Sequence, residues 1–265
     1  MKKYFLFLLL PIFFGGCEKS YNNVVDNQIS YNVESVISFD KFVYSVDDSL
    51  ITVNIKLSSS TGIKNIVFDI YSSDNKQLNE SPVKLYDNGL PGNGDTTKGD
   101  NIYSNKFPLS RYYPFGIYTI EYFITDINDI TKQVAVKTFE YDNGQTNSPP
   151  VLSNLVMPDS VKRGVDFIFT ITASDSNGLN DIKYVFFSLY KPDGSQTEFS
   201  PGQTTELMHD DGSSIFGDAV SDDGIFSYKN SFAASAQLGT WRFEFQATDR
   251  RGKFSNKIIH NMLVQ

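Results

Sequence analysis

The most constraining feature of this chain is that it repeats itself. Residues 87–126 recur as residues 210–249, at a constant spacing of 123 positions. The matches run without a gap, and pair Gly116 with Gly239 and Tyr118 with Trp241. A single spacing held over about forty residues indicates an internal duplication. The fold must therefore be one that a segment of about 120 residues can build twice.

Hydrophobic and polar residues alternate within both copies. Trp241, Phe243 and Phe245, for example, are separated by single polar residues. A period of two places side chains on opposite faces of a β-strand, and no segment of the mature chain has a convincing helical period. We therefore predict an all-β fold of two tandem immunoglobulin-like antiparallel β-sandwiches, at residues 35–141 and 151–265, with about seven strands each.

The copies differ in length ahead of the repeated segment. Residues 51–55 pair with residues 167–171 at a spacing of 116, so the second copy gains about seven residues. Pro-Asp-Gly at 192–194 is a turn signal, and we place the insertion in that loop. Between the copies, residues 142–150 read DNGQTNSPP and form the predicted linker, which the two prolines make stiff.

The amino terminus carries its own signal. Lys2 and Lys3 precede an apolar run of about eleven residues, too short to span a bilayer as a helix, and two glycines then lead to Cys17. This order resembles the signal peptide of bacterial lipoproteins, which ends at a cysteine that is lipidated. The resemblance implies a signal peptide at residues 1–16 and a lipid-anchored protein of the cell envelope, facing either side of an outer membrane.

Two alternatives remain open for this segment, which are an ordinary secretory signal and an uncleaved anchor. Residues 17–34 contain few apolar residues, and we expect Cys17 to be followed by a flexible tether. Cys17 is the only cysteine, so no disulfide supports either domain. Loss of Lys2 and Lys3 would lower the formal charge from −8 to −10, which makes nucleic acid an unfavourable partner.

An acidic loop recurs in both copies and carries the candidate metal ligands. Asp87-Asn88-Gly89 and Gly94-Asp95 in the first loop match Asp210-Asp211-Gly212 and Gly217-Asp218 in the second. This pattern resembles that of Ig-like modules in bacterial surface proteins of the choice-of-anchor X type. Carboxylates at these spacings, helped by backbone carbonyls, are candidate Ca²⁺ ligands. The competing interpretation is that aspartate and glycine are there because turns favour them. The six candidate residues are Asp87, Asp95 and Asp100 in the first loop and Asp210, Asp218 and Asp223 in the second.

The sequence offers little material for catalysis. His209 precedes the second acidic loop, but its counterpart in the first copy is Tyr86, and His260 lies on the last predicted strand. Two histidines and one lipidated cysteine do not suggest a nucleophile with a base, or a zinc site. Trp241 occupies the core register of an alternating strand. We predict no enzymatic activity and no catalytic residue.

We therefore expect a non-catalytic envelope lipoprotein that displays two modules as spacers or protein-interaction domains, with calcium as the only candidate cofactor. Its partners would be a membrane and an unidentified envelope protein or glycan. The alternative is a carbohydrate-binding accessory lipoprotein of a polysaccharide-uptake system. That alternative requires aromatic rings exposed in one plane, and Tyr112 and Tyr113 are the candidates.

Overall fold

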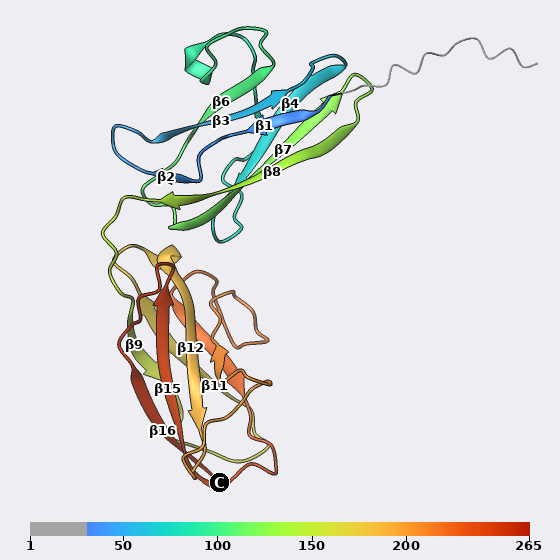
Figure 1. The fold of residues 1–265 in the computed structure, drawn as a ribbon. Coiled ribbons are helices and arrows are strands. Elements are labelled where there is room, and N and C mark those ends of the chain that lie inside the picture. Colours follow the sequence, from blue (N-terminus) through green and yellow to red (C-terminus); the bar gives the residue numbers. More distant parts are fainter. Residues whose placement is uncertain (1–30) are drawn as a thin grey trace, which may run out of the picture.

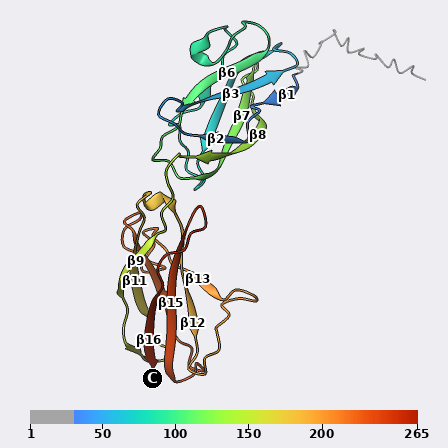
Figure 2. The same ribbon diagram turned by 60° about the vertical axis from the view of Figure 1, so that its left-hand side comes forward.

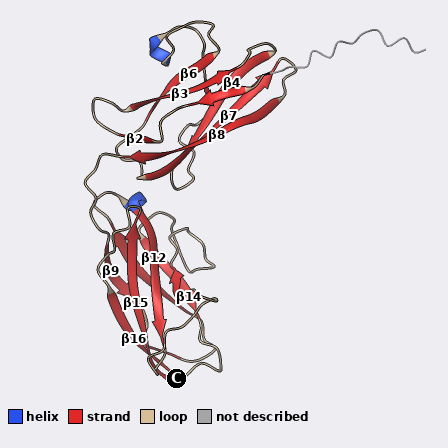
Figure 3. Ribbon diagram, in the orientation of Figure 1, coloured by secondary structure: helices blue, strands red, loops and turns tan. Residues whose placement is uncertain are grey.

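The computed structural model describes residues 31–265, which form two β-sandwiches in tandem (Figure 1). Figure 2, turned about the vertical axis, shows the same end-to-end arrangement. Figure 3 shows strands throughout, and among the described residues the helical elements are two 3₁₀ turns, η1 (Pro91–Asn93) and η2 (Leu179–Asp181). The all-β prediction is confirmed.

The first domain contains eight strands in two sheets. A three-stranded sheet has the order β1-β3-β6, and a five-stranded sheet has the order β2-β8-β7-β4-β5. Every pair is antiparallel except β2 with β8. The strands are β1 (Val33–Val36), β2 (Lys41–Val43), β3 (Leu50–Leu57), β4 (Ile63–Tyr71), β5 (Val83–Lys84), β6 (Ile102–Pro108), β7 (Gly116–Asp126) and β8 (Thr131–Asp142).

The second domain repeats this topology strand for strand. Its sheets have the orders β14-β11-β9 and β10-β16-β15-β12-β13, with one parallel pair, β10 with β16. The strands are β9 (Val151–Val156), β10 (Ser160–Val161), β11 (Phe167–Ser174), β12 (Ile182–Tyr190), β13 (Thr205–Leu207), β14 (Ile225–Asn230), β15 (Gly239–Asp249) and β16 (Ile258–Val264).

Each domain contains one parallel pair in its otherwise antiparallel sheets. In the first domain β1 pairs with β3 in one sheet, and the chain then crosses to the other sheet, where β2 runs parallel to β8. In the second domain β9 and β10 do the same with β11 and β16. Because β1 begins at Val33, residues 33 and 34 already belong to the first domain, ahead of the boundary predicted at residue 35. Tyr31 and Val33 both pack against its core.

Each domain has its own core, built by the alternating residues. Strand β3 buries every second side chain, including Val53 and Ile55. In the second domain Phe169 meets Phe187 edge to face, with ring centroids 5.3 Å apart. Burial of a large apolar side chain contributes roughly 1.5–3 kcal/mol, so two cores of this kind can do without a disulfide. Both cores lie within residues 31–265.

The seven additional residues of the second copy are not where the sequence placed them. The turns after β4 and β12 have equal length, since Tyr71 bridges Gln77 just as Tyr190 bridges Gln196. Three additional residues instead lie in the turn between β11 and β12, the turn that contains η2. The other four additional residues lie between Gln196 and β13, because Phe68 pairs with Val83 whereas Phe187 pairs with Glu206. Pro-Asp-Gly marks a turn correctly, but a turn signal does not show which copy has the longer loop.

Candidate functional site

The first acidic loop lies between β5 and β6 and brings its three predicted residues together. Asp87, Asp95 and Asp100 each place one carboxylate oxygen within 4.8 Å of the other two. Asp95 is 3% exposed. This spacing is compatible with a shared cation, because two oxygens on opposite sides of a Ca²⁺ ion are about 4.8 Å apart.

The same carboxylates also bind the amides of their own loop. Asp95 accepts hydrogen bonds from the backbone amides of Asn88, Gly89 and Thr97. These bonds, with that from Gly89 the strongest, lower the pKa of Asp95, although burial opposes them. Asp87 likewise accepts the amide of Asn101 at 3.0 Å. The loop therefore has the side-chain to backbone bonds expected of turn aspartates.

The second acidic loop has the same kind of side-chain to backbone hydrogen bonds as the first, but its three carboxylates do not come together. Asp210 accepts the amides of Asp223 and Gly224, and Asp218 accepts those of Gly212 and Ala219. Burial raises the pKa of Asp210. Within residues 31–265, the three carboxylates of this loop do not approach one another as closely as those of the first. The duplicated motif thus builds equivalent turns but different oxygen geometries.

A second convergent cluster was missed at the sequence level. Asp175, Asp181 and Asp249 each place an oxygen within 4.8 Å of the others. Asp175 follows β11, Asp181 is the last residue of η2, and Asp249 ends β15. The signal that could have revealed it is the difference between the copies, since Asp175 aligns with Ser59 and Asp181 aligns with Gly62.

The charges of this cluster are unbalanced. Asp181 is 3% exposed and Asp249 is 1% exposed. Burial first, and then the neighbouring Asp175 and Asp249, raise the pKa of Asp181 to about 6. Asp249 alone is well supplied with donors: its Oδ1 accepts the amides of Arg251 and Lys253, and its Oδ2 accepts Asn147 Nδ2 at 2.8 Å.

Two arginines that follow Asp249 reach the first domain. The Arg251 guanidinium pairs with Asp142 at 2.7 Å, donates to Gln145 O at 2.7 Å, and lies 4.5 Å from the centroid of the Phe115 ring. Arg250 Nη1 lies 3.4 Å from the backbone oxygen of Ser73. These contacts fasten the end of the second domain to the linker and to the first domain.

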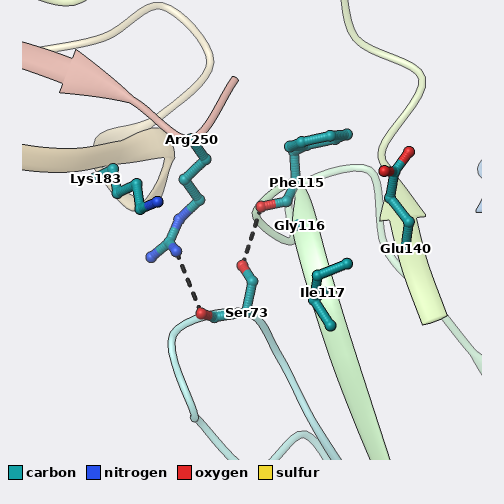
Figure 4. Close-up of a pocket in the computed structure, with 7 residues that line it drawn as sticks. All are labelled: Ser73, Phe115, Gly116, Ile117, Glu140, Lys183 and Arg250. Carbon is teal, nitrogen blue, oxygen red and sulfur yellow. Dashed lines mark hydrogen bonds between the residues drawn. The ribbon is translucent and has the colours of Figure 1, made fainter. Parts of the chain in front are cut away.

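A crevice of about 310 Å³ opens at this junction (Figure 4). Ser73 and Phe115 line it from the first domain, and Lys183 and Arg250 line it from the second. Ser73 Oγ donates to Phe115 O at 3.0 Å, which ties two loops of the first domain together beneath Arg250. The lining contains no nucleophile paired with a base, and its contacts serve to hold the domains.

A shallow, mostly apolar hollow of about 610 Å³ lies on the outer face of the β12–β13–β15 sheet. Three of its side chains are well exposed, namely Tyr184, Leu207 and Phe254. Gln203 and Thr205 supply polar groups at its edge. Aromatic rings beside amide and hydroxyl groups can hold a sugar face or a protein side chain.

The aromatic residues proposed for carbohydrate stacking are not a pair. Tyr112 is 78% exposed, but Tyr113 packs against the first core. Trp241 is 5% exposed, which confirms its core assignment, and its Nε1 donates to Gln237 O at 2.8 Å. His209 stacks on Phe216, with centroids 3.5 Å apart, and His260 Nε2 lies 3.1 Å from Pro158 O.

Cys17, the signal peptide 1–16 and most of the tether 17–34 lie outside the described residues. Within residues 31–265, no helix has the length and apolar character needed to cross a membrane.

Comparisons with known proteins do not identify the chain. Neither a protein-family model nor a curated protein matches the sequence. Fibronectin(III)-like modules of CbhA from Clostridium thermocellum share 16% identity, with 89% of this chain and 94% of that chain covered and a TM-score of 0.30. A tetra-tandem repeat from the extending region of a large adhesion protein shares 12% identity at a TM-score of 0.41.

This second alignment covers 89% of the present chain and 48% of the adhesion protein fragment, so the chain spans about half of that structure. The SrpA adhesin of Streptococcus sanguinis shares 14% identity, over 46% of this chain and 59% of that chain, with a TM-score of 0.30. Similarities at these levels do not establish a function.

Proposed function

We propose that this protein is a non-catalytic lipoprotein of the bacterial cell envelope, anchored in the outer membrane through Cys17. Its two sandwiches serve as spacer and protein-interaction modules. The observation that carries the proposal is the junction, where Arg251 binds Asp142 and the Phe115 ring. Contacts of this kind favour a fixed arrangement of the two domains, which suits a module that must hold a surface away from a membrane.

The anchoring rests on the order of residues at the amino terminus. A positive start, a short apolar run and two small residues precede Cys17. One acyl chain gives only marginal membrane binding, whereas two or more give stable anchoring, because each buried methylene contributes about 0.8 kcal/mol. A lipidated Cys17 would therefore hold the chain at the membrane without any spanning segment.

Lipidation is tested by expressing the full chain in a Gram-negative host. Mass spectrometry should find a mature amino terminus at Cys17 that carries fatty acyl chains. Cys17→Ser should move the protein from the membrane fraction to the soluble fraction. An unmodified Cys17, or a Cys17→Ser protein that stays in the membrane, would reject the anchor.

The interaction role is tested by cross-linking in intact cells. The anchored protein should capture a partner, and the cross-link should disappear when residues of the hollow around Tyr184 and Phe254, or of the sheet edges, are substituted. Reproducible failure to capture any envelope component would leave only the spacer role.

A carbohydrate-binding accessory lipoprotein of a polysaccharide-uptake system is the second candidate, favoured by the hollow around Tyr184 and Phe254. Retardation in polysaccharide affinity gels should disappear in Tyr184→Ala and Phe254→Ala. Tyr112→Ala removes a ring with 78% exposure from the first domain and is the matched control. This candidate is rejected if the parent protein is not retarded, or if Tyr184→Ala and Phe254→Ala are retarded as strongly as Tyr112→Ala.

A further inference from the structure

The cluster of Asp175, Asp181 and Asp249 lies at the end of the second domain that faces the first. Figure 3 shows η2, which ends at Asp181, beside the linker at this end. Linker residues 146–148 run across the cluster: Asn147 bonds Asp249, and Asn177 Oδ1 accepts the amide of Ser148 at 2.8 Å. The cluster therefore contacts the segment that joins the two domains.

Several oxygens here have no partner among the described residues. Asp181, though 3% exposed, accepts no hydrogen bond and forms no ion pair through its carboxylate. Asp175 Oδ2 and Asn147 Oδ1 are fully buried and unpaired. Buried acceptors left unsatisfied each cost about 1–3 kcal/mol, and such atoms often mark a missing ion or water. The two buried unpaired atoms come from separate segments, and Asp181 lies on a third.

The positive groups near the cluster are engaged elsewhere. Arg250 Nε donates to Asn180 O at 2.6 Å, and Lys253 Nζ donates to Asn147 O at 2.8 Å. Arg251 pairs with Asp142 in the linker region. In residues 31–265, no lysine or arginine forms an ion pair with Asp175, Asp181 or Asp249. Three carboxylates therefore converge without a direct ion pair, although Arg250, Arg251 and Lys253 lie near enough to attract them.

A hard divalent cation would neutralise the three carboxylates and supply a partner for the unpaired oxygens. Ca²⁺ binds six to eight oxygens at about 2.3–2.6 Å in flexible geometry, whereas Mg²⁺ requires a tight octahedron at about 2.0–2.1 Å. The oxygens, all within 4.8 Å of one another, come from three irregular turns, which suits the ion with the flexible geometry. The Asn147 amide can also contribute, because rotating it by half a turn exchanges its oxygen and nitrogen and directs Oδ1 towards Asp249 Oδ2.

We propose that Asp175, Asp181 and Asp249, together with the Asn147 amide, bind one Ca²⁺ ion that fixes the linker to the second domain. The bound ion holds Asn147 in place and orders the turn after Asp249. That turn carries Arg250 and Arg251, which contact the first domain. Calcium thereby sets the rigidity of the junction. This role is independent of the lipid anchor and of the first acidic loop.

The first copy supplies a natural comparison. Asp126 there occupies the place of Asp249 and caps the same turn, accepting the amides of Asn128 and Ile130. Ser59 stands where Asp175 would be, and Gly62 stands where Asp181 would be, because Gly62 O accepts the amide of Ile127 just as Asp181 O accepts that of Arg250. Asp175 and Asp181 therefore occur only in the second copy, at the end that meets the linker.

The binding test uses the chain from residue 18 onward, which contains both cores and no cysteine. Asp87→Asn with Asp100→Asn silences the first loop, and Ca²⁺ is titrated calorimetrically into this background. One ion per chain should bind. Asp181→Asn should abolish binding or weaken it at least about tenfold, and Asp126→Asn should leave it unchanged. No binding at millimolar calcium, or equal binding after Asp181→Asn, overturns the proposal.

Thermal unfolding distinguishes a lost ligand from a damaged fold. Without calcium, Asp181→Asn should melt at or above the parent temperature, because a buried charge is removed, and it should lose the rise that calcium gives the parent. A lower melting temperature combined with an intact calcium response overturns the proposal. Asp175→Asn, at a partly exposed position, provides a second variant if Asp181→Asn does not fold.

The junction is measured with spin labels, since the background has no cysteine. Labels at Val136→Cys and Ile259→Cys, both more than half exposed, report the distance between the domains. Calcium should narrow the distance distribution of the parent and leave that of Asp181→Asn broad. Calcium that binds without narrowing the parent distribution refutes the control of the junction.

Discussion

Arg251 is the side chain on which the arrangement of the two domains most depends. Its guanidinium makes two hydrogen bonds of 2.7 Å, one of them charged on both sides, and stacks on Phe115 at 4.5 Å. Its side chain is 18% exposed and that of Asp142 is 24% exposed, so solvent screens the pair only in part. Hydrogen bonds to charged groups contribute about 1.5–3 kcal/mol, and cation–π contacts about 0.5–1 kcal/mol.

Arg251→Ala should therefore make the free energy of docking between the two domains about 2–4 kcal/mol less favourable. Each 1.4 kcal/mol is a factor of ten, so the ratio of docked to undocked molecules should fall at least about thirtyfold. The melting of each domain should change little, because the backbone amide of Arg251 still donates to Asp249. Small-angle scattering should show a broader range of maximum dimensions, and the spin-label distribution should widen.

Lys257→Ala is the matched control, since it removes a surface ion pair with Glu244 that lies within the second domain. It should leave scattering and distances unchanged. If Arg251→Ala also leaves them unchanged, the junction contacts do not set the arrangement, and the reasoning from Arg251 is wrong.

Three further predictions concern stability. The pKa of Asp181 in the folded state, about 6, exceeds its ordinary value of 3.8, so the folded state binds more protons than the unfolded state between these values. Without calcium, the free energy of unfolding of the second domain should therefore fall by about 1–2 kcal/mol, after allowance for screening, as pH rises from about 4 to 7. Urea unfolding of Asp181→Asn should lack this component. Asp95→Ala should destabilise the first domain by about 2–4 kcal/mol by leaving loop amides unpaired, whereas unaltered melting would mean that water replaces the carboxylate. Trp241→Ala should cost about 3–5 kcal/mol, and Trp241→Phe less, with the intact Tyr118 domain as internal reference in calorimetry.

The candidate calcium ligands were only partly accessible from the sequence. The loop spacing correctly brought Asp87, Asp95 and Asp100 together, because the three lie close along one turn-rich segment. The same reasoning applied equally to Asp210 and its loop, where the carboxylates do not converge as closely. Small differences in turn geometry decide whether oxygens meet, and duplicated residue types do not encode those differences.

The sequence by itself determined the two β-sandwiches and their cores, because alternation with a period of two is a local property and the duplication shows that it was used twice. Only the tertiary structure decided the crossing of the first strand between sheets, the position of η2 and the acidic cluster at the junction. Asp181 and Asp249 meet because β12 and β15 pair in a register that places Ile182 opposite Asp249. Such a pairing is fixed by the packing of whole sheets, across dozens of intervening residues, and no local pattern specifies it.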